Sequence, residues 1–141
     1  MNGGCLCGAI RYTVDAPIKE LRACHCKSCQ KASGAGGSVN AVLQSASFTL
    51  TQGTPKRYTT VADSGRTLHR YFCGDCGSQL YSQRATTPEV LGLRAGTLDG
   101  SAGLKITANI WCASAPSWGY IDPGTTQHPG QPDAPAAGAR P

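Results

Sequence analysis

Apolar and polar residues alternate in short runs along most of the chain, and this two-residue period is typical of strands that bury one face. The alternation is clear at residues 10–14 and in the cysteines before them. Further runs of β-branched or aromatic residues cover residues 48–50, 67–72, 79–81, 90–93 and 104–111. Glycine or proline lies in nearly every gap between the runs, as expected of turns. The pattern predicts a mainly β fold built from small sheets.

Helical periodicity is weak throughout the sequence. No window carries a long 3.6-residue apolar period, so we expect at most one or two short helices, one of them near residues 28–32. From Asp122 the chain is rich in proline, glycine and alanine and offers almost nothing to bury. We therefore expect one domain over residues 1–122 and a tail over residues 123–141 that is disordered or loosely draped.

Apolar material for a large core is scarce in this chain. Aromatic residues make up 6% of the 141 residues, there is one Met, and 18 Gly and 9 Pro are spread along the sequence. A chain of this length buries only roughly two-thirds of the surface that its unfolded form exposes. The eight cysteines can supply the missing stability, either as disulfides in an oxidising compartment or as metal thiolates in a reducing one.

The N-terminal residues favour metal thiolates over disulfides. A signal peptide has a charged start and an apolar run of about seven or more residues, whereas Gly4 leads directly into a cysteine motif. No segment approaches the length of about 20 apolar residues that a membrane span needs. We expect a cytoplasmic protein that does not enter a membrane and that uses its cysteines to bind metal.

The formal charge of +5 invites a nucleic-acid interpretation, but it counts every cysteine as neutral. Seven zinc-bound thiolates and two zinc ions together lower that charge to about +2. Most of the apparent basicity disappears on this count. Nucleic acid is therefore not the partner that the charge favours.

Seven of the eight cysteines fall into groups with the spacing of metal ligands. The groups are Cys5 and Cys7; Cys24, Cys26 and Cys29; and Cys73 and Cys76. Residues two apart on an extended strand point to the same face, so a C-x-C pair can aim two sulfurs at one ion. A C-x-x-C turn does the same, with Gly74 and Gly77 supplying backbone freedom.

Two pairs supply the four thiolates that close a tetrahedral structural zinc site. The candidates are Cys5, Cys7, Cys73 and Cys76. This site would tie the first strand to a turn roughly 70 residues later, and closing so long a loop stabilises a small domain. The spacing thus predicts a structural zinc ion that replaces part of the missing core.

The middle group holds three sulfurs within a short segment and has no cysteine pair left to complete it. Cys24, Cys26 and Cys29 would leave one position of a second zinc ion open to water or substrate, which is the arrangement of a catalytic ion. A site closed by a fourth ligand remains an alternative, with Cys112, His25 and His69 as the candidates.

Each of these three candidates also has a structural interpretation. Cys112 continues the alternation of Ile106, Ala108 and Ile110, which predicts a buried, inert thiol on the last strand. His25 lies between two ligands on the opposite face of the chain, and His69 lies in a strand among polar neighbours. We expect both histidines to be structural rather than catalytic.

Several motifs, taken together, resemble the glutathione-dependent formaldehyde-activating (GFA) family, whose domain is shared with centromere protein V. The matching segments are GCLCGAIRY at residues 4–12, CHCKSCQKASG at 24–34, RYFCGDCGS at 70–78, GTLD at 96–99 and IW at 110–111. They occur in the family's order, from Gly3 to about Asp122. Asn109 departs from the pattern, because the family often has His before Ile-Trp.

The resemblance implies a tent-like β fold, with one structural zinc on the first and third cysteine groups and a second zinc on the middle group. It also implies a carbon–sulfur lyase that acts on glutathione adducts, with the addition of glutathione to formaldehyde as the reference reaction. Glutathione is anionic, so cationic and amide side chains near the ligands are candidates to bind it. These candidates are Lys27, Gln30, Lys31, Asn40 and Arg70.

Two further functions stay open at this point. The kinship with centromere protein V permits a non-catalytic zinc module that binds a protein or nucleic-acid partner. An enzyme of the same mechanism with a different electrophile or thiol fits the cysteine spacing equally well. The sequence specifies neither the electrophile nor the oligomeric state.

Overall fold

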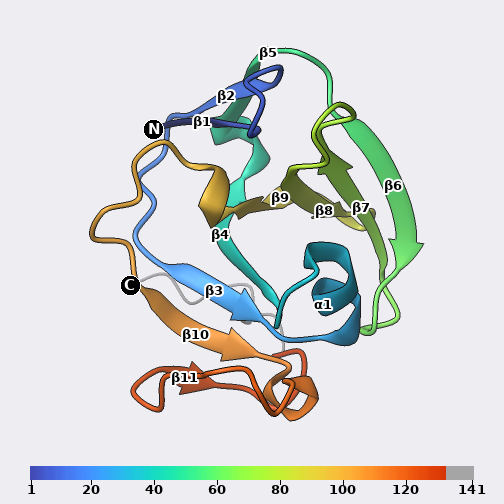
Figure 1. The fold of residues 1–141 in the computed structure, drawn as a ribbon, viewed down its shortest axis with the longest axis vertical. Coiled ribbons are helices and arrows are strands. Elements are labelled where there is room, and N and C mark those ends of the chain that lie inside the picture. Colours follow the sequence, from blue (N-terminus) through green and yellow to red (C-terminus); the bar gives the residue numbers. More distant parts are fainter. Residues whose placement is uncertain (133–141) are drawn as a thin grey trace.

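The computed structural model describes residues 1–132 and confirms a mainly β fold with little helix. The strands form two sheets. The smaller sheet has the order β1-β2-β5, from strands β1 (Asn2–Gly4), β2 (Arg11–Val14) and β5 (Phe48–Gln52), and all its pairs are antiparallel. It lies at one end of the molecule (Figure 1).

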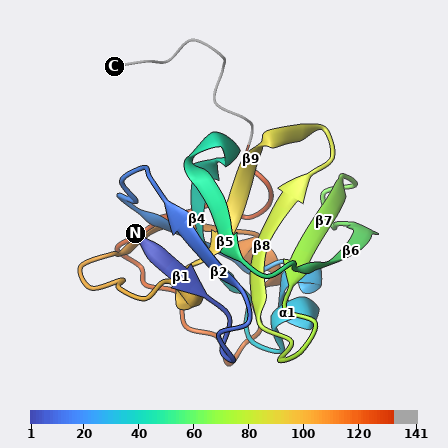
Figure 2. The same cartoon turned by 90° about the horizontal axis from the view of Figure 1, so that it is seen from above.

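The larger sheet has eight strands in the order β11-β10-β3-β4-β9-β8-β7-β6. Their bounds are β3 (Leu21–Cys24), β4 (Ser38–Gln44), β6 (Lys56–Val61), β7 (Thr67–Phe72), β8 (Gln79–Arg84), β9 (Thr87–Arg94), β10 (Ile106–Ile110) and β11 (Thr126–Gln127). Register shifts in the β3–β10, β7–β8 and β8–β9 pairs add local bends. The sheet therefore curves around the interior of the molecule (Figures 1 and 2).

One short α-helix, α1 (Lys27–Ser33), follows β3, and the predicted helix near residues 28–32 is confirmed. Its N-cap is Cys26, whose sulfur accepts a hydrogen bond from the Cys29 N–H. It ends at Gly34, where the backbone is left-handed with φ 67° and glycine carries no Cβ penalty. In Figure 1 the helix lies between the ends of β3 and β7. No helix among residues 1–132 is long and apolar enough to cross a membrane.

The main core joins the two sheets through aromatic side chains. The Phe48 ring lies 5.1 Å from that of Tyr12 and 4.9 Å from that of Tyr81, and Tyr81 in turn stacks on Tyr71 at 4.4 Å. Cys5 and Cys73 are buried in this same cluster, whereas Cys24, Cys26 and Cys29 form a separate small cluster with Ile110. The cysteines thus occupy positions that a larger protein would fill with apolar side chains.

The segment after Asp122 differs from its predicted disorder as far as residue 132. Strand β11 pairs in parallel with β10, and the N–H of Trp111 donates to the carbonyl of Gly130 over 3.1 Å. These contacts use the backbone, so the lack of apolar side chains did not prevent them. Of the two expectations for the tail, disorder does not describe residues 123–132, which lie against β10 and the residues after it, and residues 133–141 lie outside the described residues.

The last long strand ends earlier than the alternation predicted. Trp111 takes a left-handed conformation with φ 59°, which stops β10 at Ile110. Cys112 then begins a 3-10 turn, Cys112–Ser114, and is half-buried. The expectation of a buried Cys112 on the strand face is therefore wrong.

Candidate functional site

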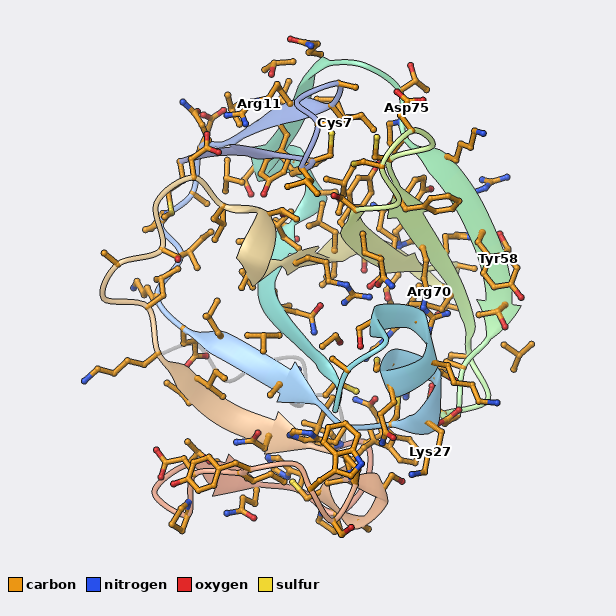
Figure 3. The ribbon with its side chains drawn as sticks, in the orientation of Figure 1. Cys7, Arg11, Lys27, Tyr58, Arg70 and Asp75 are labelled. Atoms are coloured by element: carbon orange, nitrogen blue, oxygen red, sulfur yellow. The ribbon has the colours of Figure 1, made fainter. Side chains whose placement is uncertain are left out.

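The first and third cysteine groups meet at one end of the molecule. Cys5 and Cys7 lie in the turn between β1 and β2, and Cys73 and Cys76 lie in the turn between β7 and β8. Figure 3 shows the two turns side by side, marked by the labels of Cys7 and Asp75. All four sulfurs lie within 4.8 Å of one another. The four residues that the spacing grouped are thus brought together in space.

The sulfur separations fit a tetrahedral zinc ion. The Cys5 and Cys7 sulfurs are 3.5 Å apart, and those of Cys7 and Cys73 are 3.8 Å apart. Zinc–sulfur bonds of about 2.3 Å place tetrahedral ligands about 3.8 Å from one another. These two separations match the spacing of ligands on one zinc ion.

Both turns of this group depend on a left-handed glycine just after the cysteines. The N–H of Gly8 donates to the Cys5 carbonyl over 3.1 Å, and that of Gly77 donates to the Cys73 carbonyl over 3.0 Å. Their φ values of 78° and 75° favour glycine. The predicted freedom of Gly77 is confirmed. Gly74 has no such φ, and a Cβ there would instead meet the Lys56 side chain at 2.6 Å.

Without a cation, the sulfurs of this group compete for negative charge. The Ser78 hydroxyl and backbone lower the pKa of Cys76 to about 5. A backbone hydrogen bond at Ala9 favours the Cys7 thiolate, but the neighbouring Cys5 and Cys76 outweigh it and raise the pKa of Cys7 to about 12. A divalent ion removes this conflict because it favours all four thiolates at once.

The middle cysteine group surrounds the start of α1. Cys24 ends β3, Cys26 caps the helix and Cys29 lies in its first turn. Their exposed fractions are 9%, 5% and 9%, and their sulfurs lie within 4.8 Å of one another. No fourth Cys, His, Asp or Glu among residues 1–132 belongs to this group. The described chain therefore supplies three ligands to this centre.

The three buried sulfurs also conflict when no cation is bound. The neighbouring Cys24 and Cys26 thiols favour the Cys29 thiolate and lower its pKa to about 2, whereas Cys26 and Cys29 raise the pKa of Cys24. One negative charge is stabilised here and three are not. The group has the chemistry of a site that needs a cation.

Neither histidine candidate joins this group. The His25 ring faces away, with Nε2 2.9 Å from Asn109 Oδ1 and Nδ1 3.2 Å from the Gly36 carbonyl. His69 Nδ1 lies 2.8 Å from the Thr59 hydroxyl. Both rings hold polar partners within the fold, as expected of structural histidines.

A cavity of about 620 Å³ lies between α1 and the β6–β8 part of the sheet. Ser28 and Lys31 line it from the helix, and Tyr58, Arg70 and Gln79 line it from the strands. Its volume is typical of small-molecule sites. Ser28 lies between Cys26 and Cys29 in the sequence, so the cavity reaches the helix that carries this cysteine group, although no cysteine lines it.

The predicted glutathione contacts divide into two sets. Lys31 and Arg70 line the cavity, whereas Lys27, Gln30 and Asn40 do not. The Gln30 amide donates to the carbonyls of His25 and Ser114 over 2.6 and 2.8 Å. Asn40 donates to Ser38 and accepts from Arg94. Gln30 and Asn40 thus hold the fold around the centre.

Sequence reasoning missed two polar residues that shape this region. Arg94 is buried and donates to Gln79 Oε1 over 3.2 Å. Burial lowers its pKa, and the negative charge of Cys29 offsets only part of this shift. Asp63, in the β6–β7 turn, accepts hydrogen bonds from the N–H and hydroxyl of Ser28. The only sequence feature that could have indicated a role for Arg94 is its position as a charged residue directly after the apolar run at residues 90–93.

The comparison with known families agrees with the arrangement of the cysteines. The profile described as "Glutathione-dependent formaldehyde-activating enzyme" matches residues 1–114. The chain belongs to this GFA family. The match includes all seven cysteines of the two groups, so the resemblance seen in the sequence is confirmed.

Three similar proteins carry provisional names as glutathione-dependent formaldehyde-activating enzymes. The Halomonas elongata protein is 29% identical over 103 residues, which cover 70% of this chain and 66% of the relative. The Sordaria macrospora protein is 34% identical over 54% of this chain and 31% of the relative. The Penicillium rubens protein is 29% identical over 56% and 40%, respectively. The chain thus spans less than two-thirds of each relative's length.

The fold of this chain is similar to that in a crystal structure of a Rhodobacter sphaeroides protein. It superimposes with a TM-score of 0.59 at 22% identity, covering 76% of this chain and 100% of that one. At this identity the likeness concerns the fold.

We predict that Cys112→Ala leaves the zinc content of this GFA protein unchanged. Cys112 lies outside both sulfur groups, in a 3-10 turn beyond β10. Zinc per chain, measured by elemental analysis of the wild type and the variant, checks this directly. Loss of one ion from the variant would instead show that Cys112 closes the second site.

Proposed function

We propose that this GFA protein is a zinc-dependent carbon–sulfur lyase that acts on glutathione adducts and forms S-hydroxymethylglutathione from glutathione and formaldehyde. The observation that supports it is a buried set of three cysteines beside a cavity with cationic residues. We place the reaction in the cytoplasm, where thiols stay reduced.

The proposal assigns separate roles to the cysteine groups. Cys5, Cys7, Cys73 and Cys76 hold a structural zinc, and Cys24, Cys26 and Cys29 hold a second, catalytic zinc. Zinc with an open position supplies the acidity that deprotonates a bound thiol and keeps its sulfur in place. Two zinc ions per chain follow from this assignment.

The reaction needs one new bond and one proton transfer. The glutathione sulfur adds to the carbonyl carbon of formaldehyde, the carbonyl electron pair moves to oxygen, and the thiol proton ends on that oxygen. Lys31 and Arg70 line the cavity and attract the anionic tripeptide.

Exchange NMR on a mixture of glutathione, formaldehyde and the zinc-loaded protein tests this function. We expect the rate of adduct exchange to rise in proportion to protein concentration. Cys26→Ser, which changes only the second cysteine group, is the matched control. An exchange rate equal to the spontaneous one would exclude formaldehyde as the electrophile, and binding of glutathione without exchange would indicate another electrophile.

A further inference from the structure

Arg70 is a buried cation with two unused donors. Its exposed fraction is 7%, and its Nε and Nη2 atoms are buried without a hydrogen-bond partner among the described residues. The side chain lies between β7 and α1 (Figure 3). Buried charged groups are nearly always paired, and an unpaired one destabilises the fold. The arrangement therefore indicates a partner from outside the described residues.

The two unused donors share one edge of the guanidinium group. Nε–H and Nη2–H point in parallel, which matches the two oxygens of a carboxylate. Among residues 1–132, no Asp or Glu lines the cavity. The one ion pair among these residues joins Arg11 to Asp99, which do not line the cavity. A carboxylate partner would therefore come from outside these residues, and Arg70 lines a cavity that a ligand can enter.

We propose that the Nε and Nη2 edge of Arg70 binds the glycyl carboxylate of glutathione, an inference that rests on the proposed function. The γ-glutamyl carboxylate fits less well because an ammonium group adjoins it. That ammonium would enter a cavity lined by the cations of Lys31 and Arg70, with no acidic residue of the described lining to balance it. The glycyl carboxylate carries no such neighbour, so Arg70 would select for it.

Calorimetric titration of the zinc-loaded full chain tests the assignment with two ligands. One is glutathione and the other is its monoethyl ester, in which the glycyl carboxylate is blocked. We expect the wild type to bind the ester about tenfold or more weakly, as for loss of a charge-assisted bidentate pair. We expect Arg70→Gln to bind both ligands equally, at the level of the ester.

Two further variants control for the loss of charge and for the effect on folding. Arg57→Gln removes the same charge from the neighbouring strand, on the opposite face of the sheet, and should keep the preference for glutathione. Arg70→Met replaces the buried charge by a similar apolar volume, so its thermal midpoint without ligand should equal or exceed that of the wild type while the preference is lost. Loss of the preference in a folded Arg70→Met protein supports the assignment.

The other outcomes overturn the inference in distinguishable ways. Equal binding of glutathione and the ester by the wild type, or a preserved preference in Arg70→Gln, would refute the role of Arg70 and leave the proposed function intact. Cysteinylglycine keeps the glycyl carboxylate and lacks the γ-glutamyl one. If Arg70→Gln weakened glutathione but not cysteinylglycine, the glycyl assignment would be wrong. If the wild type bound none of these ligands, the proposed function would fail together with this inference.

Discussion

Replacing Cys76 with serine is expected to unfold or aggregate the protein. Cys76 is one of four sulfurs that link the β1–β2 turn of the smaller sheet to the β7–β8 turn of the larger one. Structural zinc contributes about 10–16 kcal/mol in small zinc domains, whereas a whole domain is stable by only about 5–15 kcal/mol. Loss of one ligand therefore removes a stabilising term as large as the net stability.

Far-UV circular dichroism, size-exclusion chromatography and zinc analysis of Cys76→Ser measure this effect. The matched control is Ser78→Ala, which removes the hydroxyl 3.2 Å from the Cys76 sulfur but keeps all four ligands. The same hydroxyl also accepts from the Leu6 N–H over 3.0 Å, so its loss should cost about 1–3 kcal/mol, as for two hydrogen bonds. A folded, monodisperse Cys76→Ser protein with wild-type zinc content would contradict the structural role of this site.

Some strands with a buried face were predictable from the sequence, whereas β3 and β4 were not among the expected runs although both bury side chains. The run at residues 67–72 corresponds to β7, and the run at 90–93 lies within β9. Strand β6 was missed because its side chains are almost all exposed and it alternates weakly. An edge strand of this kind is held by backbone pairing with β7, which leaves little trace in the side-chain pattern.

The cysteine groups could be predicted because local spacing decides how two sulfurs share an ion. The predicted conformation of one cysteine pair was nevertheless wrong. Cys5 and Cys7 lie in a hairpin turn rather than on the predicted extended strand. Turn and strand both bring sulfurs two residues apart to one side, so the pairing survived the error. The second set of sulfurs was likewise visible from spacing alone.

The charges around the cavity could not be placed from the sequence. Arg70 and Arg94 lie on different strands, and their proximity depends on how β7, β8 and β9 pair across two register shifts. A one-residue slip would turn either side chain to the other face. The unpaired edge of Arg70 is thus a property of the folded sheet.

Replacing Cys26 with serine is expected to remove one zinc ion and the proposed activity while leaving the fold in place. Cys26 supplies one of three sulfurs to the second centre and also caps α1 by accepting from the Cys29 N–H over 3.3 Å. Serine is among the best helix N-caps, so the cap survives the change. Two remaining thiolates do not complete the three-ligand site of a catalytic zinc.

Zinc per chain should fall from two toward one, and the adduct exchange rate measured by NMR should fall to the spontaneous rate. Circular dichroism should match that of the wild type because the first cysteine group, in the other core cluster, is untouched. Cys112→Ser is the matched control and should change neither quantity, since its sulfur belongs to neither group. Equal damage from Cys26→Ser and Cys76→Ser would contradict the division into a structural and a catalytic ion, because the division requires that only one centre holds distant segments together.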